Sequence, residues 1–293
     1  MLAVIDAHHH LWDPAARDLR WLADDQPWAS EEELRPLRRS FTTADLADVA
    51  VPEGVTGTVV VQALDDPAET ADMLAIAAKA SDGAEGGLVK AVVGWADLTA
   101  PDVADQIAGY QGLPGGNRLA GMRHPLIAEP DPEWLARPAV RSGLRVLGEA
   151  GLSFGLTVFE RQLAGAVATV RSVPGCLFTL DHMGGPPAET GADGGWATAI
   201  ADLGRCENVV CKLSGAHTEP VSADALRPYF DALLAAFGPS RLMIGSDWPV
   251  SSLTAPYHDM WNMYRELIAG LSPAEQDAIL DGTARRVYRQ GFA

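Results

Sequence analysis

The sequence lacks several patterns that mark particular classes of protein. It has three cysteines, Cys176, Cys206 and Cys211, and no CxxC pair. An odd, scattered set of cysteines argues against a disulfide framework or a zinc ribbon and favours a reducing compartment. No apolar run approaches the ~20 residues that a membrane span needs, and no basic segment followed by an apolar run opens the chain. We therefore expect a cytoplasmic protein with no membrane partner.

Basic residues are also few: 22 Lys and Arg stand against 39 Asp and Glu, for a formal net charge of −17. Nucleic-acid binding depends on clustered basic side chains, so no such partner is expected. Neither a GxGxxG nor a phosphate-binding-loop motif is present, which disfavours a nucleotide-binding open sheet. No repeat or linker-like tract divides the chain, and we expect one domain, residues 1–293.

What the sequence does contain is a series of eight short apolar segments with helical patterns between them. Most are β-branched or aliphatic and are bounded by Gly, Pro or Asp, as strands are. Nearly continuous apolar character is typical of parallel strands buried on both faces. Alternating strands and helices predict a single (β/α)8 TIM barrel, of the α/β class, with a doubly wound open sheet as the alternative. The segments are 3–9, 58–63, 90–95, 119–124, 153–159, 176–182, 208–215 and 241–247.

Two helices near the C-terminus have recognisable boundaries. Residues 222–238 carry an apolar stripe that ends at Gly238, and Pro228 is expected to kink this helix. A second helix begins at Ser272, which forms a capping box with Glu275.

The connection between the first two strands, residues 12–57, is unusually long and contains Trp12, Trp21 and Trp28. Connections in compact domains are mostly short, and long ones often serve a site. We expect this segment to fold over the strand ends as a lid.

Polar side chains follow several strands at the end where barrel enzymes carry their sites. Side chains alternate along a strand, so Asp6, His8 and His10 are expected to share the inner face while His9 points away. His182, Asp247, Arg123, His124 and Lys212 stand at or near the ends of other strands. Each of these residues alone has an ordinary structural explanation. Because all of them are expected at the same end of the barrel, a common functional site is favoured.

These motifs resemble a known family. "DAHHHLWD", "GMRHPL", "LDHMGGP", "KLSG" and "RLMIGSDWPV" follow one another along nearly the whole chain. The pattern is similar to the amidohydrolase superfamily, in its amidohydrolase 2 branch of sugar-lactone and pyrone-dicarboxylate lactonases. L-fuconolactone and L-rhamnonolactone hydrolases are its nearest types. Gly185 stands where relatives often have Lys, and Thr283 where they favour Asn. Members of this superfamily are (β/α)8 barrels.

The resemblance implies a carboxylic ester hydrolase that opens a sugar-acid lactone, with a role in carbohydrate metabolism. It implies that His8, His10, His182 and Asp247 form the core of the catalytic site and that Asp247 is the base that activates water. The imidazoles would then donate hydrogen bonds to the carbonyl oxygen. Arg123, with His124 and Lys212, would hold the oxygens of the substrate, and Trp95, Gln62 and Trp248 are further candidates to line the pocket.

The case for a metal is weaker in the sequence. Superfamily members with two metals bridge them with a carboxylated lysine or a glutamate and add a histidine from strand 5, and "GLTVF" offers none of these. We therefore expect no required cofactor. The alternative is one divalent metal, zinc by preference, bound by His8, His10 and Asp247.

Two other functions stay open. One is a metal-dependent decarboxylase of the same superfamily, a lyase. The other is a non-catalytic sugar-acid binding protein on the same scaffold, against which the intact His and Asp set argues. The exact lactone and a homo-oligomeric state are also left open.

Overall fold

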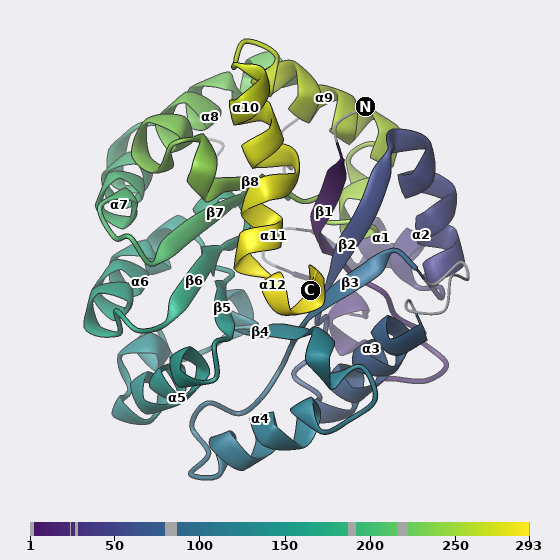
Figure 1. Ribbon diagram of the computed structural model, residues 1–293, viewed down its shortest axis with the longest axis vertical. Helices are drawn as coiled ribbons and strands as arrows, with labels where there is room; N and C mark the ends of the chain where they lie inside the picture. Colours follow the sequence, from purple (N-terminus) through teal and green to yellow (C-terminus); the bar gives the residue numbers. More distant parts are fainter. Residues whose placement is uncertain are drawn as a thin grey trace.

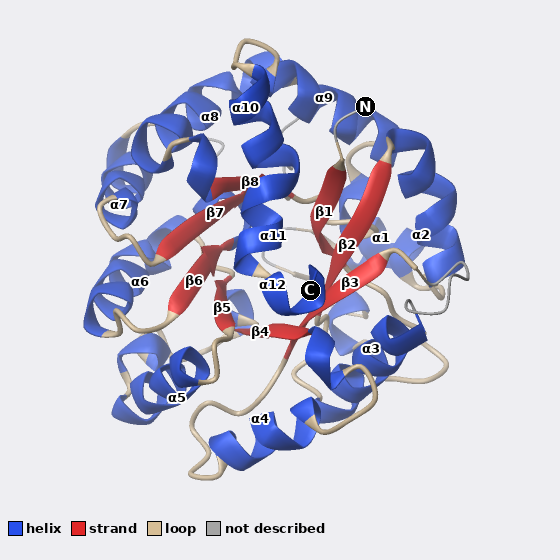
Figure 2. Ribbon diagram, viewed as in Figure 1, coloured by secondary structure: helices blue, strands red, loops and turns tan. Residues whose placement is uncertain are grey.

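The computed structural model describes residues 3–23, 25–26, 29–79, 87–186, 192–215 and 222–292. Its centre is one parallel sheet in which the eight strands pair in chain order. A parallel bridge between His9 and Trp248, together with contacts between the first and last strands, brings the two edges together into a barrel (Figures 1 and 2). The strands are β1 (Val4–His9), β2 (Val55–Val61), β3 (Val89–Gly94), β4 (Leu119–His124), β5 (Ser153–Leu156), β6 (Leu177–Leu180), β7 (Val209–Leu213) and β8 (Leu242–Ile244).

Helices surround this barrel, as the alternating pattern predicts (Figure 2). None of the helices in the described ranges is long and apolar enough to cross a membrane. The helices are α1 (Glu31–Leu34), α2 (Thr43–Ala50), α3 (Pro67–Lys79), α4 (Val103–Gln111), α5 (Pro138–Glu149), α6 (Glu160–Ser172), α7 (Gly194–Gly204), α8 (Ala223–Phe237), α9 (Tyr257–Ile268), α10 (Pro273–Asp277), α11 (Thr283–Val287) and α12 (Arg289–Phe292). The (β/α)8 expectation is confirmed.

The expected boundaries of the two late helices are confirmed. Ser222 caps α8 by accepting a hydrogen bond from the third residue of the helix, and Gly238 ends it. Pro228 lies inside this helix without breaking it into two elements. Ser272 and Glu275 form the capping box that begins α10.

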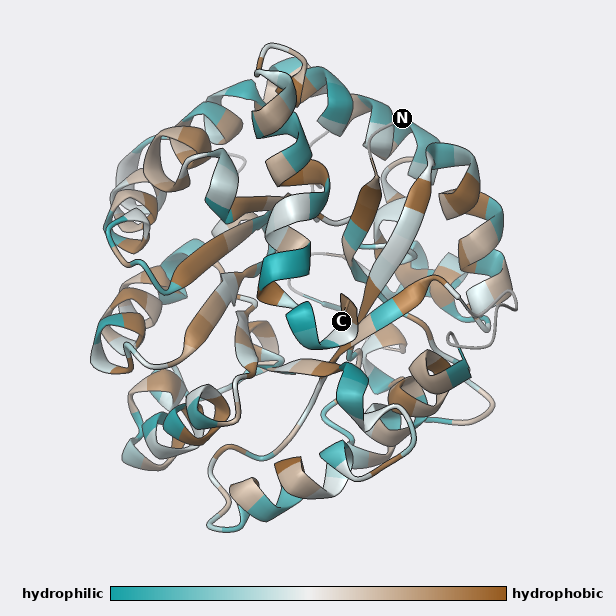
Figure 3. Ribbon diagram, viewed as in Figure 1, coloured by the Kyte–Doolittle hydropathy of each residue, from teal (hydrophilic) through white to brown (hydrophobic). Residues whose placement is uncertain are grey.

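The strands are buried on both faces, which explains their nearly continuous apolar sequences. Outward side chains pack against the helices, and inward ones form a second, smaller core inside the barrel. Figure 3 shows the resulting hydrophobic strands inside a ring of mixed helices. Tyr288 and Val287 contribute to the inner core from the C-terminal helices.

Those C-terminal helices close one end of the barrel. In Figure 1, α10 to α12 run across its centre in yellow. Gly291 lies so close to the start of β3 that a Cβ atom there would come within 2.2 Å of the carbonyl oxygen of Lys90. The amino-terminal end of the barrel is therefore covered, and the carboxyl ends of the strands form the opposite mouth.

Part of the long segment after β1 contacts that mouth. Trp12 forms an antiparallel bridge with Phe41, and the Phe41 ring meets Trp248 edge to face. Trp21 packs edge to face on Trp12, while Trp28 lies outside the described residues. That the segment covers the site as a lid stays a prediction.

Candidate active site

The three consecutive histidines of the first strand do not face the same way. Nε2 of His9 lies 2.9 Å from the hydroxyl of Thr58 on β2. The Nε2 atoms of His8 and His10 lie 3.3 Å from each other. His8 and His10 therefore form a pair from which His9 is turned away, the division that strand alternation predicts.

Asp6 departs from the same expectation. Ile5 belongs to the inner core of the barrel, whereas the Asp6 carboxylate accepts a hydrogen bond from Tyr257 of α9, in the outer layer. The pairing of β1 with β2 shifts register between Asp6 and His9. A bulge of this kind interrupts the alternation, so the prediction that Asp6 shares the face of His8 is wrong.

Asp6 instead fastens the first strand to the residues that follow the last. Its carboxylate accepts hydrogen bonds from the Ser246 amide at 2.8 Å and the Ser246 hydroxyl at 2.6 Å. It also accepts the amide of His8 at 3.2 Å. The two chain segments that carry His8 and Asp247 are thus held to one buried group.

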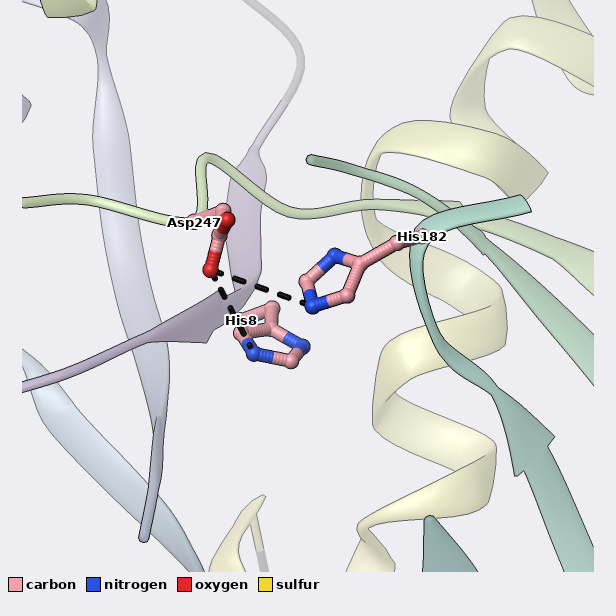
Figure 4. A group of neighbouring side chains, drawn as sticks. All are labelled: His8, His182 and Asp247. Carbon is pink, nitrogen blue, oxygen red and sulfur yellow. Dashed lines mark ion pairs between the residues drawn. The ribbon is translucent and has the colours of Figure 1, made fainter. Parts of the chain in front are cut away.

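Three imidazoles converge on Asp247 at the barrel mouth. Oδ1 of Asp247 lies 3.4 Å from Nε2 of His10, 3.7 Å from Nε2 of His8 and 4.0 Å from Nε2 of His182. Figure 4 shows His8, His182 and Asp247 pointing toward one another, and one ligand atom from each lies within 4.8 Å of the others. In a tetrahedral zinc site with bonds of about 2.0–2.1 Å, neighbouring ligand atoms are about 3.3 Å apart. The distances from Asp247 to the three imidazoles, and the distance from His8 to His10, are on this scale.

The opposite ring nitrogens support this interpretation. Nδ1 of His10 lies 2.7 Å from the carbonyl oxygen of Val61, which only accepts, so Nδ1 carries the proton. Nε2 of His10 faces the Asp247 carboxylate, and a cation between the two would stabilise that arrangement. Nδ1 of His182 is held by the Ser214 hydroxyl at 3.0 Å. Imidazoles anchored in this way are typical metal ligands, so the residues present fit a divalent metal.

Unusual backbone geometry presents two of these groups. Asp247 and His182 adopt φ values of 58° and 52°, in the left-handed region that residues other than glycine rarely occupy. Two glycines make room beside them. A Cβ atom on Gly245 would approach Cβ of His8 to 2.5 Å, and one on Gly215 would approach Nδ1 of His182 to 2.5 Å. The close packing leaves each imidazole little freedom.

The protonation states follow from burial and from neighbouring charges. Burial by itself would raise the pKa of the Asp247 carboxyl, but the facing imidazole of His182 makes the largest opposing contribution, and this pKa lies well below its usual range. Burial, together with the charge of Lys212, lowers the pKa of His8 well below its ordinary value. Asp247 is therefore ionised, and His8 is neutral and able to offer a lone pair.

A carboxylate that the sequence did not single out, Asp181, adjoins the group. It is fully buried, and its Oδ1 lies 3.0 Å from Nζ of Lys212 and 3.7 Å from Nδ1 of His8. Its Oδ2 lies 3.5 Å from Nη1 of Arg123. Burial would raise the pKa of Asp181, but Lys212, His8 and Arg123 lower it well below its usual range. In the sequence, the only indication that Asp181 lies near the site was its position directly before His182.

Three of the residues expected to contact substrate are buried. Gln62 and Lys212 are each 1% exposed. The Gln62 amide donates to the backbone carbonyl of Arg123 at 3.2 Å, and Arg123 donates back to Gln62. Trp248 is buried against Phe41. That Gln62, Lys212 and Trp248 contact substrate stays a prediction.

Trp95 and His124 are half-buried and remain candidates for substrate contact. The Trp95 indole donates to Nδ1 of His124 at 3.3 Å, and Nε2 of His124 lies 2.9 Å from the Glu129 carboxylate. The His124 ring also stacks on Trp134, with ring centroids 4.1 Å apart. This chain of contacts fixes the Trp95 ring beside β4.

Candidate metal ligands at the carboxyl ends of β1, β6 and β8 of a parallel barrel are the arrangement found in metal-assisted (β/α)8 enzymes. The chain belongs to the amidohydrolase family, whose model matches residues 5–290.

Characterised and solved proteins are similar to this chain over almost its whole length. It is 34% identical over 292 residues to an L-fucono-1,5-lactonase of Burkholderia ambifaria, covering 97% of this chain and 95% of that protein. It is 34% identical over 299 residues to an L-fucono-1,5-lactonase of Burkholderia multivorans, with the same coverage. A crystal structure of a Burkholderia multivorans amidohydrolase with bound Zn has a TM-score of 0.85 and 32% identity, covering 98% of this chain and 99% of that one.

These findings overturn the expectation that no cofactor is required. A family member 32% identical to this chain was crystallised with zinc. The present chain groups His8, His182 and Asp247 with the spacing of metal ligands. The missing strand-5 histidine argues against a site with two metals, but it does not argue against a single metal. His182, expected as a catalytic residue only, also joins the possible ligands.

Proposed function

We propose that this protein is a lactonase that hydrolyses the lactone of a sugar acid with the help of one divalent metal. His8, His10, His182 and Asp247 would hold the metal. The observation that carries this proposal is the 34% identity, over 97% of the chain, to two L-fucono-1,5-lactonases. The convergence of three imidazoles and one carboxylate at the barrel mouth supports it.

A divalent metal at such a site acts as a Lewis acid and lowers the pKa of water. Asp247 would serve as the general base. Its carboxylate is ionised, buried and fixed at the rim by backbone contacts, since its amide donates to the His8 carbonyl at 2.8 Å. It accepts a proton from the water whose oxygen attacks the lactone carbonyl carbon. A low pKa makes a weak base, so precise positioning must contribute much of the rate.

Ring opening then requires a proton at the leaving oxygen. The bond between the carbonyl carbon and the ring oxygen breaks, and the alkoxide takes up the proton that Asp247 received. The product is an open hydroxy acid, and Asp247 returns to its ionised state. No further co-reactant is needed, since water supplies both the hydroxyl and the proton.

Negative charge develops on the carbonyl oxygen during the attack, and fixed positive charge stabilises it. Arg123 supplies such a charge. Its Nη1 lies 3.2 Å from Nε2 of His8, and Gln62 holds the guanidinium. Because Arg123 is 8% exposed, it would act at short range from the wall of the site rather than as a mobile clamp.

The hydroxyl groups of the sugar would lie toward Trp95 and His124. The Trp95 indole N–H is already used by His124, which leaves the ring surface for the substrate. Aromatic surfaces of this kind bind the apolar faces of ring-shaped ligands in otherwise polar sites.

The test is a panel of lactones assayed with a pH indicator, since each turnover releases acid. Zinc-loaded protein should hydrolyse aldono-1,5-lactones, with L-fucono-1,5-lactone included because of the relatives. Aldono-1,4-lactones and a carboxylated pyrone serve as comparison substrates. Turnover of the pyrone alone, or release of carbon dioxide from an aromatic acid without lactone hydrolysis, would refute the sugar-lactone assignment.

A further inference from the structure

We propose that Glu129 is a positioning residue that acts through His124 to fix the indole ring of Trp95 as a wall of the substrate site. The carboxylate would touch neither metal nor substrate. It would control how tightly the ring of the substrate is bound rather than the rate of the chemical step. This inference rests on the proposed function for its substrate, but the positioning itself does not depend on which lactone is bound.

The first part of the argument is the direction in which Trp95 points. Val93 belongs to the inner core of the barrel. A Cβ atom on Gly94 would come within 2.5 Å of Cγ2 of Thr70 on α3, so this position faces the helices. Continued alternation then turns Trp95, the residue directly after β3, toward the inside of the barrel mouth. The residue is partly exposed there.

The second part is what holds the Trp95 side chain. The Trp95 amide donates to the Thr70 hydroxyl at 2.9 Å, which anchors the backbone. A half-buried indole can still adopt more than one rotamer unless a contact selects one. The indole N–H donates to Nδ1 of His124 at 3.3 Å, and this bond determines the orientation of the ring.

The third part is the tautomer of His124, which is not one of the candidate metal ligands. An indole N–H only donates, so Nδ1 of His124 must offer a lone pair. A neutral imidazole then carries its proton on Nε2. That atom lies 2.9 Å from Oε2 of Glu129, which accepts the proton in a hydrogen bond. The contacts at the two nitrogens thus require the same tautomer, and Glu129 stabilises it.

The fourth part is the orientation of the His124 ring. The ring stacks on Trp134, with centroids 4.1 Å apart and an angle of 2° between the planes. Stacking on a flat surface sets the plane but permits a half-turn about the Cβ–Cγ bond, which would carry Nδ1 away from Trp95. The same half-turn would break the bond from Nε2 to Glu129. Glu129 therefore selects the orientation that stacking leaves open.

Glu129 is itself held in place. Its Oε1 accepts the amide of Asp131 at 3.1 Å. The Asp131 carboxylate accepts a hydrogen bond from Nε of Arg137 at 2.7 Å, which ties the loop to the residue before α5. The side chains of Glu129 and His124 are only 13% and 14% exposed. Water therefore competes less for their hydrogen bond than it would on an open surface.

The end of β4 connects this chain of contacts with the centre of the site. Nη1 of Arg123 lies 3.2 Å from Nε2 of His8, and His124 is the next residue along the strand. A ring-shaped substrate with its carbonyl group near the candidate metal ligands would therefore extend toward Trp95. Its apolar face would lie against the indole, as ring ligands do on aromatic side chains.

The first readout needs no substrate. In protein labelled with 15N-tryptophan, the indole N–H signal of Trp95 is assigned by its absence in Trp95→Phe. Glu129→Ala should shift this signal and speed its exchange with solvent, because His124 no longer holds the indole. Glu129→Gln keeps an acceptor for Nε2 of His124 and should leave the signal near its native position. An unchanged Trp95 signal in Glu129→Ala would overturn the proposal.

The second readout is steady-state kinetics at zinc saturation, on the lactone that is hydrolysed fastest. Glu129→Ala should raise KM about tenfold, the scale of one hydrogen bond to a charged group. It should change kcat by less than about threefold, because the wall contacts ground state and transition state alike. Glu129→Gln should restore most of the native KM. A fall in kcat at unchanged KM would contradict the role given to Trp95.

The matched control is Glu133→Ala, which removes an exposed carboxylate from the same loop. It should leave both KM and the Trp95 signal native. Zinc affinity of Glu129→Ala, measured by competition with a chromophoric chelator, should stay within about threefold of native, since distant sites act independently. Equal increases of KM in the two variants, or a loss of zinc affinity, would indicate a general disturbance and overturn the proposal.

Failure of this inference can be told apart from failure of the proposed function. A panel on which the native protein hydrolyses no lactone would remove the proposed function, together with the substrate assigned to this wall. The indole signal would still decide whether Glu129 fixes Trp95. Conversely, native lactone hydrolysis with an unchanged indole signal in Glu129→Ala would overturn the positioning role alone.

Discussion

The hydroxyl of Ser246 donates to Oδ2 of Asp6 at 2.6 Å and joins the last strand of the barrel to the first. The same hydroxyl accepts the Trp248 amide at 3.0 Å. Ser246 is fully buried, so neither bond is exchanged with solvent. These buried hydrogen bonds help to close the barrel, and they lie next to the chain segments that carry His8 and Asp247.

Ser246→Ala should lower the free energy of unfolding. The substitution leaves the Trp248 amide without its partner, and a buried unsatisfied group costs about 1–3 kcal/mol. It also removes one of the two hydrogen bonds to Oδ2 of Asp6, which keeps the one from Tyr257 at 3.0 Å. Urea denaturation of the zinc-free protein measures the change. Ser252→Ala, at an exposed residue whose hydroxyl donates to the carbonyl of Pro249, is the control and should cost less. Equal losses in the two variants would contradict the role given to Ser246.

Removal of the metal should abolish most of the lactonase activity. Dialysis against a strong chelator is expected to give inactive, folded protein, and addition of one equivalent of zinc should restore the rate. Because zinc binds the native state only, it should also raise Tm in proportion to the logarithm of its free concentration. Full activity in protein shown by elemental analysis to be metal-free would refute the corrected cofactor assignment.

Asp247→Asn should lower kcat by about 10²–10⁴, the range typical of general-base loss. The amide keeps the shape of the side chain but cannot take the proton from water. Since the same substitution weakens metal binding, kcat must be measured at zinc saturation, with metal content and circular dichroism checked. A variant that retains more than about a tenth of the native kcat, above that range, would show that Asp247 is not the base.

The orientation of the histidines gives a separate comparison. His9→Asn should change kcat far less than His8→Asn or His10→Asn, because His9 is bonded to Thr58 on the other face. Steady-state kinetics of the three variants on one lactone decides the order. If His9→Asn were the most damaged, the placement of the pair would be incorrect.

A pH dependence of stability is expected from Glu69, a residue of α3 that is 5% exposed. Burial raises the pKa of Glu69 to about 7, against hydrogen bonds from the amides of Leu64 and Ala63 that lower it. The raised pKa means that the folded state holds this proton more tightly than the unfolded state does. The stabilisation is complete below about pH 4.5, the ordinary value, and is lost as the pH rises through about 7.

Glu69→Gln replaces the carboxyl by an amide that does not titrate. The free energy of unfolding of the variant, relative to the native protein, should therefore increase between pH 4.5 and pH 7. Urea titrations at several pH values measure that difference, in which other ionisable groups cancel. A difference that stays constant across the range would show that Glu69 titrates normally.

Local patterns in the sequence determined the architecture and much of the site. Continuous apolar segments, bounded by Gly, Pro and Asp, indicated eight buried parallel strands because a strand covered on both faces has no polar side. The capping box of Ser272 and Glu275 depends on residues three apart, so it could be identified without tertiary information. The division between His9 and its two neighbours followed from strand alternation in the same way.

Contacts between distant segments decided the rest. Asp6 faces outward because β1 changes register against β2, which the sequence of β1 alone does not encode. β8 ends at Ile244, before the predicted limit of 247, because the chain turns there into the left-handed φ of Asp247.

The ion pairs of Asp181 depend on cations from β4 and β7, and the burial of Gln62 and Lys212 depends on how the strands meet inside the barrel. The candidate metal site has the same origin. Its residues come from β1 and from the chain just after β6 and β8, and they acquire a common centre only when the barrel closes.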